Sequence, residues 1–300
     1  MDPIAGTLRL PTAADAESVA ARLERGELIS FASCPFPLPD VDERALLFEQ
    51  RLDGTEPGHI GLDPRSGRVH GSAPQTEAQA DRLRRVLGQA ADHMTRWLEG
   101  YLPAYAGGAE LDDVAFHPEE EATRKLGTLD RNDLLHVDVP SERSQGRRLL
   151  RVYVNLHPTD ARVWQTSLSF AELLERYGPD IGLMGPAASR WWRPWRQRLL
   201  RLMHGGRVPS GPFEDFMARL HDALKLHDAF QERAPKRCWQ FKPGAAWVVF
   251  TDGAAHAELR GRFVLEFALH VAQHKLAHPE LSPWAQFERA CGIAKQAHAA

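Results

Sequence analysis

The prediction of the fold begins with residues 147–156, which run Arg147-Arg148-Leu149-Leu150-Arg151-Val152-Tyr153-Val154-Asn155-Leu156. Successive side chains of an extended strand point to opposite faces. Leu150, Val152 and Val154 therefore share one face, and the polar side chains between them share the other. A strand buried in a sheet is apolar on both faces unless one face borders a polar cavity. The alternation predicts a strand whose second face either lines a polar pocket or meets solvent.

The polar face of this strand carries Arg151, Tyr153 and Asn155 in line. An arginine followed by a phenol and an amide suits a pocket for a carboxylate, with Arg151 as its bidentate partner. The alternative is a half-solvated strand without a ligand, and the pattern alone leaves both readings open.

Other parts of the chain repeat the strand signal or show helical spacing. Alternation returns at 247–251 and 263–269, and a short strand is expected at 28–31. Helical spacing of apolar residues occurs at 13–25, 77–98, 167–177, 213–232 and 283–300. Strands this far apart, without regular strand–helix alternation, favour an antiparallel sheet system. We expect an α+β protein with a mainly β core, a double-stranded β-helix (jelly roll) flanked by helices.

The domain organisation follows from the same spacing. Residues 1–110 are expected to form a helical and mixed region that packs on the barrel. Residues 111–282 would form the core, with a helical insert at 165–235, and 283–300 a C-terminal helix.

Composition narrows the class of protein. The 300 residues carry 37 Lys and Arg against 40 Asp and Glu, a net charge of −3. This leaves no overall positive field of the kind that nucleic-acid-binding proteins use, so no nucleic-acid partner is expected. No apolar run reaches the length of a membrane span, and three scattered cysteines do not make a disulfide framework. We expect a cytoplasmic protein.

The first candidate metal ligands are His136 and Asp138, in a His-x-Asp tripeptide. On a strand their side chains point to the same side, which supplies two members of the 2-His-1-carboxylate triad of non-haem Fe(II) oxygenases. His and Asp are common enough here that about one such tripeptide is expected by chance, so a capped strand end is the alternative.

The third candidate ligand is His256. It follows the β-rich run at 247–251 and a turn that contains Gly253. Its distance of about 120 residues from His136 suits a ligand that arrives from a late strand of the same barrel. The alternative is an ordinary loop histidine.

Taken together, several stretches in register resemble one family, the Fe(II)/2-oxoglutarate-dependent 3-deoxy-D-manno-octulosonic acid (Kdo) 3-hydroxylases of Gram-negative bacteria. The matching pieces are 135–138, 146–158 with its Leu-Arg-Val-x-x-Asn core, 162–164, 220–222, and 241–256, which reads Phe-x-Pro-Gly-x-x-Trp-x-Val-Phe-Thr-Asp-Gly-x-x-His. Their order and approximate spacing hold from about residue 113 to 290.

The resemblance implies a double-stranded β-helix in which His136, Asp138 and His256 hold Fe(II) and are the catalytic centre. 2-Oxoglutarate would chelate the metal, and dioxygen would be consumed as C3 of Kdo is hydroxylated. The substrate would be Kdo attached to lipid A, a lipopolysaccharide component, at the cytoplasmic face of the inner membrane.

The resemblance also bears on how 2-oxoglutarate is held. Many members of the wider superfamily place an arginine about ten residues after the second histidine, where this chain has Glu266. We therefore expect Arg151 to bind the far carboxylate, aided by Tyr153 or Asn155. Arg148 and Arg162 are the next candidates.

Three departures from the family pattern concern the substrate. The chain reads Phe-His-Pro at 116–118 where Phe-Arg-Pro is expected, Asn-Asp-Leu at 132–134 where a Thr-Arg ending is expected, and Glu-Phe-Ala at 266–268 where Glu-Gln-Thr is expected. One alternative is the same chemistry on another sugar or a small natural product. Another is a jelly roll that binds lipid or sugar without turnover.

Residues 190–202 combine tryptophans and arginines in an otherwise slightly acidic chain. As a helix, this segment would set Trp192, Trp195 and Leu199 on one side and arginines on others. Such a helix suits peripheral contact with an anionic membrane. The alternative is a helix that packs its tryptophans on the barrel.

Overall fold

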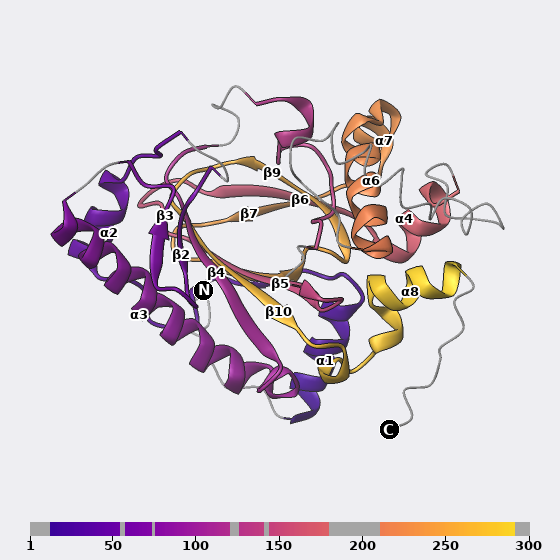
Figure 1. The fold of residues 1–300 in the computed structure, drawn as a ribbon, viewed down its shortest axis with the longest axis horizontal. Coiled ribbons are helices and arrows are strands. Elements are labelled where there is room, and N and C mark those ends of the chain that lie inside the picture. The colour runs from indigo at the N-terminus through magenta and orange to yellow at the C-terminus, as the bar shows by residue number, and fades with distance from the viewer. Residues whose placement is uncertain are drawn as a thin grey trace, which may run out of the picture.

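Two antiparallel sheets form the centre of the molecule in the computed structural model, which describes residues 13–54, 58–73, 76–120, 126–140, 144–179 and 211–291 (Figure 1). The larger sheet has seven strands in the order β1-β8-β5-β10-β4-β2-β3. These are Ile29–Phe31, Ala246–Phe250, Arg148–Asn155, Val264–Val271, Ala109–His117, Ile60–Asp63 and Arg68–His70. The smaller sheet has the order β7-β6-β9, with bounds Arg237–Phe241, Arg162–Ser169 and Ala254–Arg260.

The two faces of β5 lie in different environments, as its alternation predicts. Leu150, Val152 and Val154 belong to the apolar core on the outer face of the large sheet. On the inner face, Tyr153 packs with its ring centroid 4.7 Å from that of Trp164 on β6. The polar face is therefore buried between the sheets, and the half-solvated alternative is wrong.

The outer face of the large sheet is covered by α3 (Glu77–Tyr101), which packs Leu83, Val86 and Leu87 into the same core as β5. The first turn of α3 is fixed by a capping box between Thr76 and Gln79. Helices α1 (Ala13–Glu24) and α2 (Val41–Glu49) also lie at the large sheet (Figure 1).

A second group of helices lies toward the end of the small sheet (Figure 1). It comprises α4 (Phe170–Tyr177), α6 (Pro212–Leu226), α7 (Asp228–Arg233) and α8 (Pro283–Ala290). Their apolar side chains form one cluster with Leu135 and Val137, which flank His136. This cluster anchors the segment that carries the first candidate ligands. Short 3-10 turns occur at Pro103–Tyr105, Thr128–Asp130, Gln273–Lys275 and Pro279–Leu281.

Four sequence expectations about elements need correction or fall outside the described residues. The helix expected from 167 begins at Phe170, because β6 continues to Ser169 and the Ser169 side chain caps the helix. The helix expected at 213–232 is two helices, because the chain is extended at His227 between α6 and α7. The expected helix 190–202 and the end of 283–300 lie outside the described residues. No described helix has the length and apolar character needed to cross a bilayer.

Candidate metal centre

Backbone hydrogen bonds bring the two candidate histidines together. His136 donates its backbone N–H to the carbonyl of His256 at 3.0 Å, and His256 donates back at 2.9 Å. The centroids of their rings lie 4.6 Å apart. Asp138, two residues on, donates its N–H to the carbonyl of Thr251 at 3.0 Å, so its side chain points to the same place.

Three potential ligand atoms converge as a result. Asp138 Oδ1 lies 3.7 Å from Nε2 of His136 and 3.7 Å from Nε2 of His256. Both separations are too long for a hydrogen bond. An ion bound at the usual 2.0–2.2 Å from each atom would fit between them after only small movements.

The tautomer of each imidazole is fixed by the backbone. His136 Nδ1 lies 2.8 Å from the carbonyl of Leu134, and His256 Nδ1 lies 3.1 Å from the carbonyl of Ala254. A carbonyl only accepts, so each Nδ1 carries the proton and donates it. Each neutral ring then presents the Nε2 lone pair to the centre, as a metal ligand must.

Electrostatics keep His136 and Asp138 in their ligating forms. Burial, followed by the neighbouring His256, holds the pKa of His136 well below its usual value, so that ring stays neutral. Burial raises the pKa of Asp138, but effects led by the charge of Arg151 outweigh burial and lower the pKa overall. A neutral His136 ring and an ionised Asp138 carboxylate therefore lie beside Nε2 of His256 at the centre.

Arg151 lies directly beside this centre. Its Nε donates to Asp138 Oδ2 at 2.7 Å and to Thr251 Oγ1 at 3.2 Å, and its Nη1 forms an ion pair with Glu266. The side chain is 26% exposed, and Nη2 donates to none of the described residues. Arg151 can therefore offer a donor to a ligand while it remains paired with two carboxylates.

The other two arginine candidates are engaged elsewhere. Arg148 points to the outer face of β5, where it pairs with Asp252 at 3.0 Å and donates to the carbonyl of Glu24. The structure does not bring it to the centre. Arg162 lies between the sheets, where it pairs with Glu258 and donates to the Gly261 carbonyl.

Tyr153 and Asn155 differ in availability. Tyr153 stacks on Trp247 with centroids 5.1 Å apart, and burial holds its pKa well above the usual value, so the phenol keeps its proton. The Asn155 amide donates to the carbonyls of Asp160 and Phe241 and accepts from the N–H of His157. Asn155 thus holds a turn together and has little capacity left for a ligand.

Two side chains from the family-like stretches 162–164 and 220–222 lie against the proposed ligands. Trp164 stacks on His256 with centroids 5.4 Å apart, and the His221 ring meets His136 edge-on at 5.4 Å. His117 Nε2 lies 2.8 Å from Glu266 Oε2, which extends the ion pair of Arg151 across β10 to β4. His117, where the chain departs from the family pattern, thus contacts Glu266, where the expected glutamate is present.

The chain matches a known protein family over nearly its whole length. A sequence model of 3-deoxy-D-manno-oct-2-ulosonic acid (Kdo) hydroxylase matches residues 9–294. A search of curated proteins gave no match.

Solved structures of one protein, the Kdo hydroxylase KdoO, a non-heme Fe(II) alphaketoglutarate-dependent dioxygenase, are similar in fold. The complex with alphaketoglutarate and Fe(III) is 27% identical with a TM-score of 0.81, covering 95% of this chain and 92% of that one. The complex with cobalt(II) is 26% identical with a TM-score of 0.83, covering 97% and 96%.

Proposed function

Since this chain belongs to the Kdo hydroxylase family, we propose that His136, Asp138 and His256 bind the catalytic Fe(II) of an Fe(II)/2-oxoglutarate-dependent dioxygenase. The observation that carries this assignment is the pair of 3.7 Å separations from Asp138 Oδ1 to the two Nε2 atoms. The enzyme class is that of KdoO, and dioxygen is the co-substrate. Three protein ligands leave other positions on Fe(II) open for a chelating keto acid.

When bound, Fe(II) couples the oxidative decarboxylation of 2-oxoglutarate to hydroxylation of a substrate C–H bond. The protein's contribution is to hold the ligands and exclude water. The backbone-fixed tautomers of His136 and His256 keep both lone pairs on the ion, and Arg151 keeps the Asp138 carboxylate oriented and ionised.

Arg151 is the residue that we propose for the far carboxylate of 2-oxoglutarate, through its Nη2 atom. Arg148 is ruled out by its position on the outer face. Buried donors without a hydrogen-bond partner occur nearby, at Nε1 of Trp164 and Trp247 and at Nε of Arg162. Burying an unpaired donor costs free energy, so these atoms favour a ligand rich in acceptor oxygens between the sheets. Tyr153, stacked on Trp247, would donate from the same side.

The sheet arrangement supports a double-stranded β-helix as the finer description of the fold. Strands β8, β5, β10 and β4 make one layer, and β7, β6, β9 and the segment at His136, which pairs with His256, make the other. Residues 1–110 would extend this core, since β1, β2 and β3 pair at the edges of the large sheet.

The substrate that we propose is Kdo carried on lipid A, hydroxylated at C3 at the cytoplasmic face of the inner membrane. The sequence of residues 190–202, with arginines beside tryptophans, suits contact with anionic lipid. That segment lies outside the described residues, and its contact is proposed from composition.

The test is succinate formation from 2-oxoglutarate with Kdo–lipid A present. Asp138→Ala should reduce turnover about 1000-fold or more, because Asp138 is the one carboxylate among the three proposed protein ligands of the ion. Asp160→Ala, at an aspartate whose side chain is 73% exposed, is the matched control and should keep full activity. Full turnover by Asp138→Ala would refute the assignment.

Mass spectrometry of lipid A from cells with and without the protein distinguishes the substrate. A Kdo heavier by one oxygen atom only when the protein is present supports lipid-linked Kdo. An unchanged Kdo mass with intact 2-oxoglutarate turnover supports another sugar, as the family departures at His117 and Phe267 suggest.

A further inference from the structure

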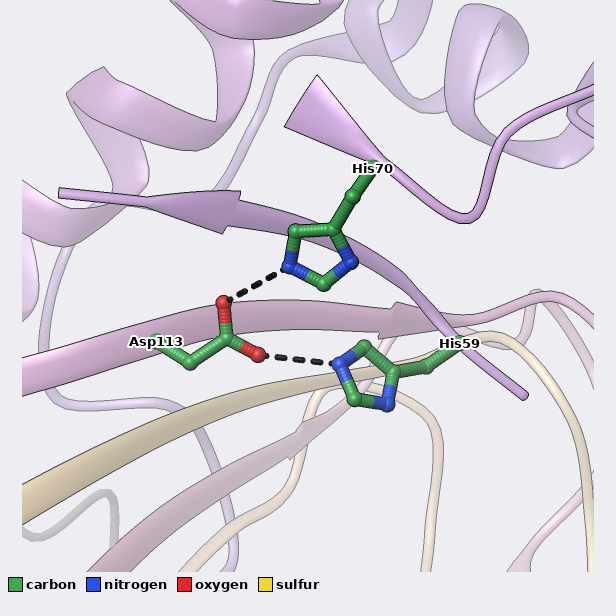
Figure 2. A group of neighbouring side chains, drawn as sticks. All are labelled: His59, His70 and Asp113. Carbon is green, nitrogen blue, oxygen red and sulfur yellow. Dashed lines mark hydrogen bonds and ion pairs between the residues drawn. The ribbon is translucent and has the colours of Figure 1, made fainter. Parts of the chain in front are cut away.

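A second group of two histidines and one carboxylate lies away from the proposed iron centre. His59 directly precedes β2, His70 ends β3, and Asp113 lies in β4. These strands are hydrogen-bonded neighbours, and the pairing of Gly61 with both His70 and Ala115 brings the three side chains together. Figure 2 shows both rings directed at one carboxylate, His70 from the end of β3 and His59 from the residue before β2.

We propose that His59, His70 and Asp113 form a second site for a divalent transition-metal ion such as Zn(II). Their ligand atoms lie within 4.8 Å of one another. His59 Nε2 is 2.9 Å from Asp113 Oδ2, and His70 Nε2 is 3.4 Å from Asp113 Oδ1. Ligands of a tetrahedral zinc ion lie about 3.3 Å apart, as follows from bond lengths of about 2.0–2.1 Å. The two measured separations bracket that value.

The set of donors also fits a metal ion. Two imidazoles and a carboxylate are ligands that Zn(II), Co(II) and Fe(II) accept. Without an ion, each ring donates from Nε2 to the carboxylate, and an ion bound at Nε2 would take the place of that proton, which a neutral ring then carries on Nδ1. The side chains are 16%, 28% and 23% exposed for His59, His70 and Asp113, so an ion can reach them and keep a position open to water or a further ligand.

The backbone beside the group leaves room for it. Residue 61 is a glycine, and a Cβ there would lie 2.3 Å from the His70 ring and 3.0 Å from Asp113 Oδ1. Any larger residue would push the His70 ring away from the carboxylate. The short approach of His70 to Asp113 therefore depends on the missing side chain at Gly61.

Asp113 is the charged member of the group. Its two carboxylate oxygens face the two rings, Oδ2 toward His59 and Oδ1 toward His70. His117 lies next to the group, with its ring centroid 5.5 Å from that of His59, but its Nε2 is engaged by Glu266. The three named residues are therefore the protein ligands of the site.

The site is independent of the proposed iron centre, and metal-binding stoichiometry separates the two. The full chain, freed of metal by a chelator, is dialysed against Zn(II), and bound metal is counted. Wild type should bind two ions per chain, Asp138→Ala one, Asp113→Asn one, and the double variant none. His278→Gln, which removes a 38% exposed histidine paired with Glu280, is the matched control and should bind two.

The outcomes distinguish the second site from the iron centre. If Asp138→Ala binds no Zn(II), the second site is overturned. If Asp113→Asn binds no Zn(II), the result counts against the iron centre alone. Retention of two ions by Asp113→Asn also overturns the second site. His70→Gln, at the edge of the sheet, repeats the test if Asp113→Asn does not fold. As an independent readout, Zn(II) should raise the melting temperature of Asp138→Ala and leave that of the double variant unchanged.

Discussion

Arg151 contacts the proposed iron ligand Asp138 and the carboxylate of Glu266 at the same time. A guanidinium can do this because its planar group presents five donors in fixed directions. We propose that the same side chain positions a metal ligand and binds the cosubstrate. For this single residue, the effect on cosubstrate binding can be separated by experiment from the effect on stability.

Arg151→Gln is expected to raise KM for 2-oxoglutarate about 10- to 100-fold and to destabilise the fold by about 3–5 kcal/mol, because the buried carboxylate of Glu266 and the partly buried carboxylate of Asp138 lose their partner. The matched control is Arg148→Gln, which removes the buried pair with Asp252 on the outer face of the same strand. That variant should be destabilised by a similar amount with KM unchanged. An equal rise in KM in both variants would place the effect in stability and not in binding. Steady-state kinetics and urea unfolding give both quantities.

His117 gives the protein a pH-dependent stability. Burial lowers its pKa, but the hydrogen bond and charge of Glu266 outweigh burial and raise the pKa above 6.5. Glu258 and Arg162 also act on this ring, with opposite signs, and His59 lies beside it. A raised pKa in the folded state stabilises the protein below the unfolded value and loses its effect as pH rises through the folded value.

The free energy of unfolding of the wild type should therefore fall from about pH 6.5 upward relative to His117→Gln. The two proteins are compared by urea unfolding at several pH values, and the difference between their curves is the quantity of interest. A difference that does not change with pH would show that His117 is not charged in the folded protein.

At the scale of elements, two glycines illustrate why position decides the effect of a side chain. Gly61 on β2 leaves room for His70, whereas Gly88 in α3 has only an ordinary 3.9 Å neighbour, Leu62, where a Cβ would be. Gly61→Ala should destabilise the protein by about 1–3 kcal/mol through overpacking. Gly88→Ala, the matched control, should stabilise it by about 0.5–1 kcal/mol, because glycine is a poor helix former. Thermal unfolding measures both, and equal effects would contradict the packing argument.

The elements also show where sequence reasoning works. Strands β5, β8 and β10 could be predicted because their outer faces are continuous apolar rows that pack under α3. Strand β4 is harder, because Asp112, Asp113 and His117 interrupt its alternation. Its polar side chains are accommodated by pairing with Glu266 and with histidines of other strands, which a single sequence does not display. Strand β9 begins Ala-Ala-His-Ala, a composition that favours a helix in isolation.

At the scale of the whole molecule, the chain brings together residues that are distant in sequence. His136 and His256 were predicted to meet on their spacing and the family resemblance, and their convergence is produced by one backbone bridge. The second histidine group could not be predicted, because His59, His70 and Asp113 share no motif and meet only through the register of β2 with β3 and β4. The choice of Arg151 over Arg148 and Arg162 also needed the structure, because it depends on their partners: Arg148 pairs with Asp252 and Arg162 with Glu258, whereas Arg151 lies beside Asp138.

The row Asp138, Arg151, Glu266 and His117 alternates in sign across neighbouring strands. A carboxylate that joins Arg151 adds negative charge to this row and raises the proton affinity of His117. At pH values near or above the raised pKa of His117, cosubstrate binding should therefore draw a fraction of a proton from solution. Titration calorimetry would detect this uptake as a heat of binding that differs between Tris and phosphate buffers. The difference between buffers should be smaller in His117→Gln. The affinity for the keto acid would then depend on pH.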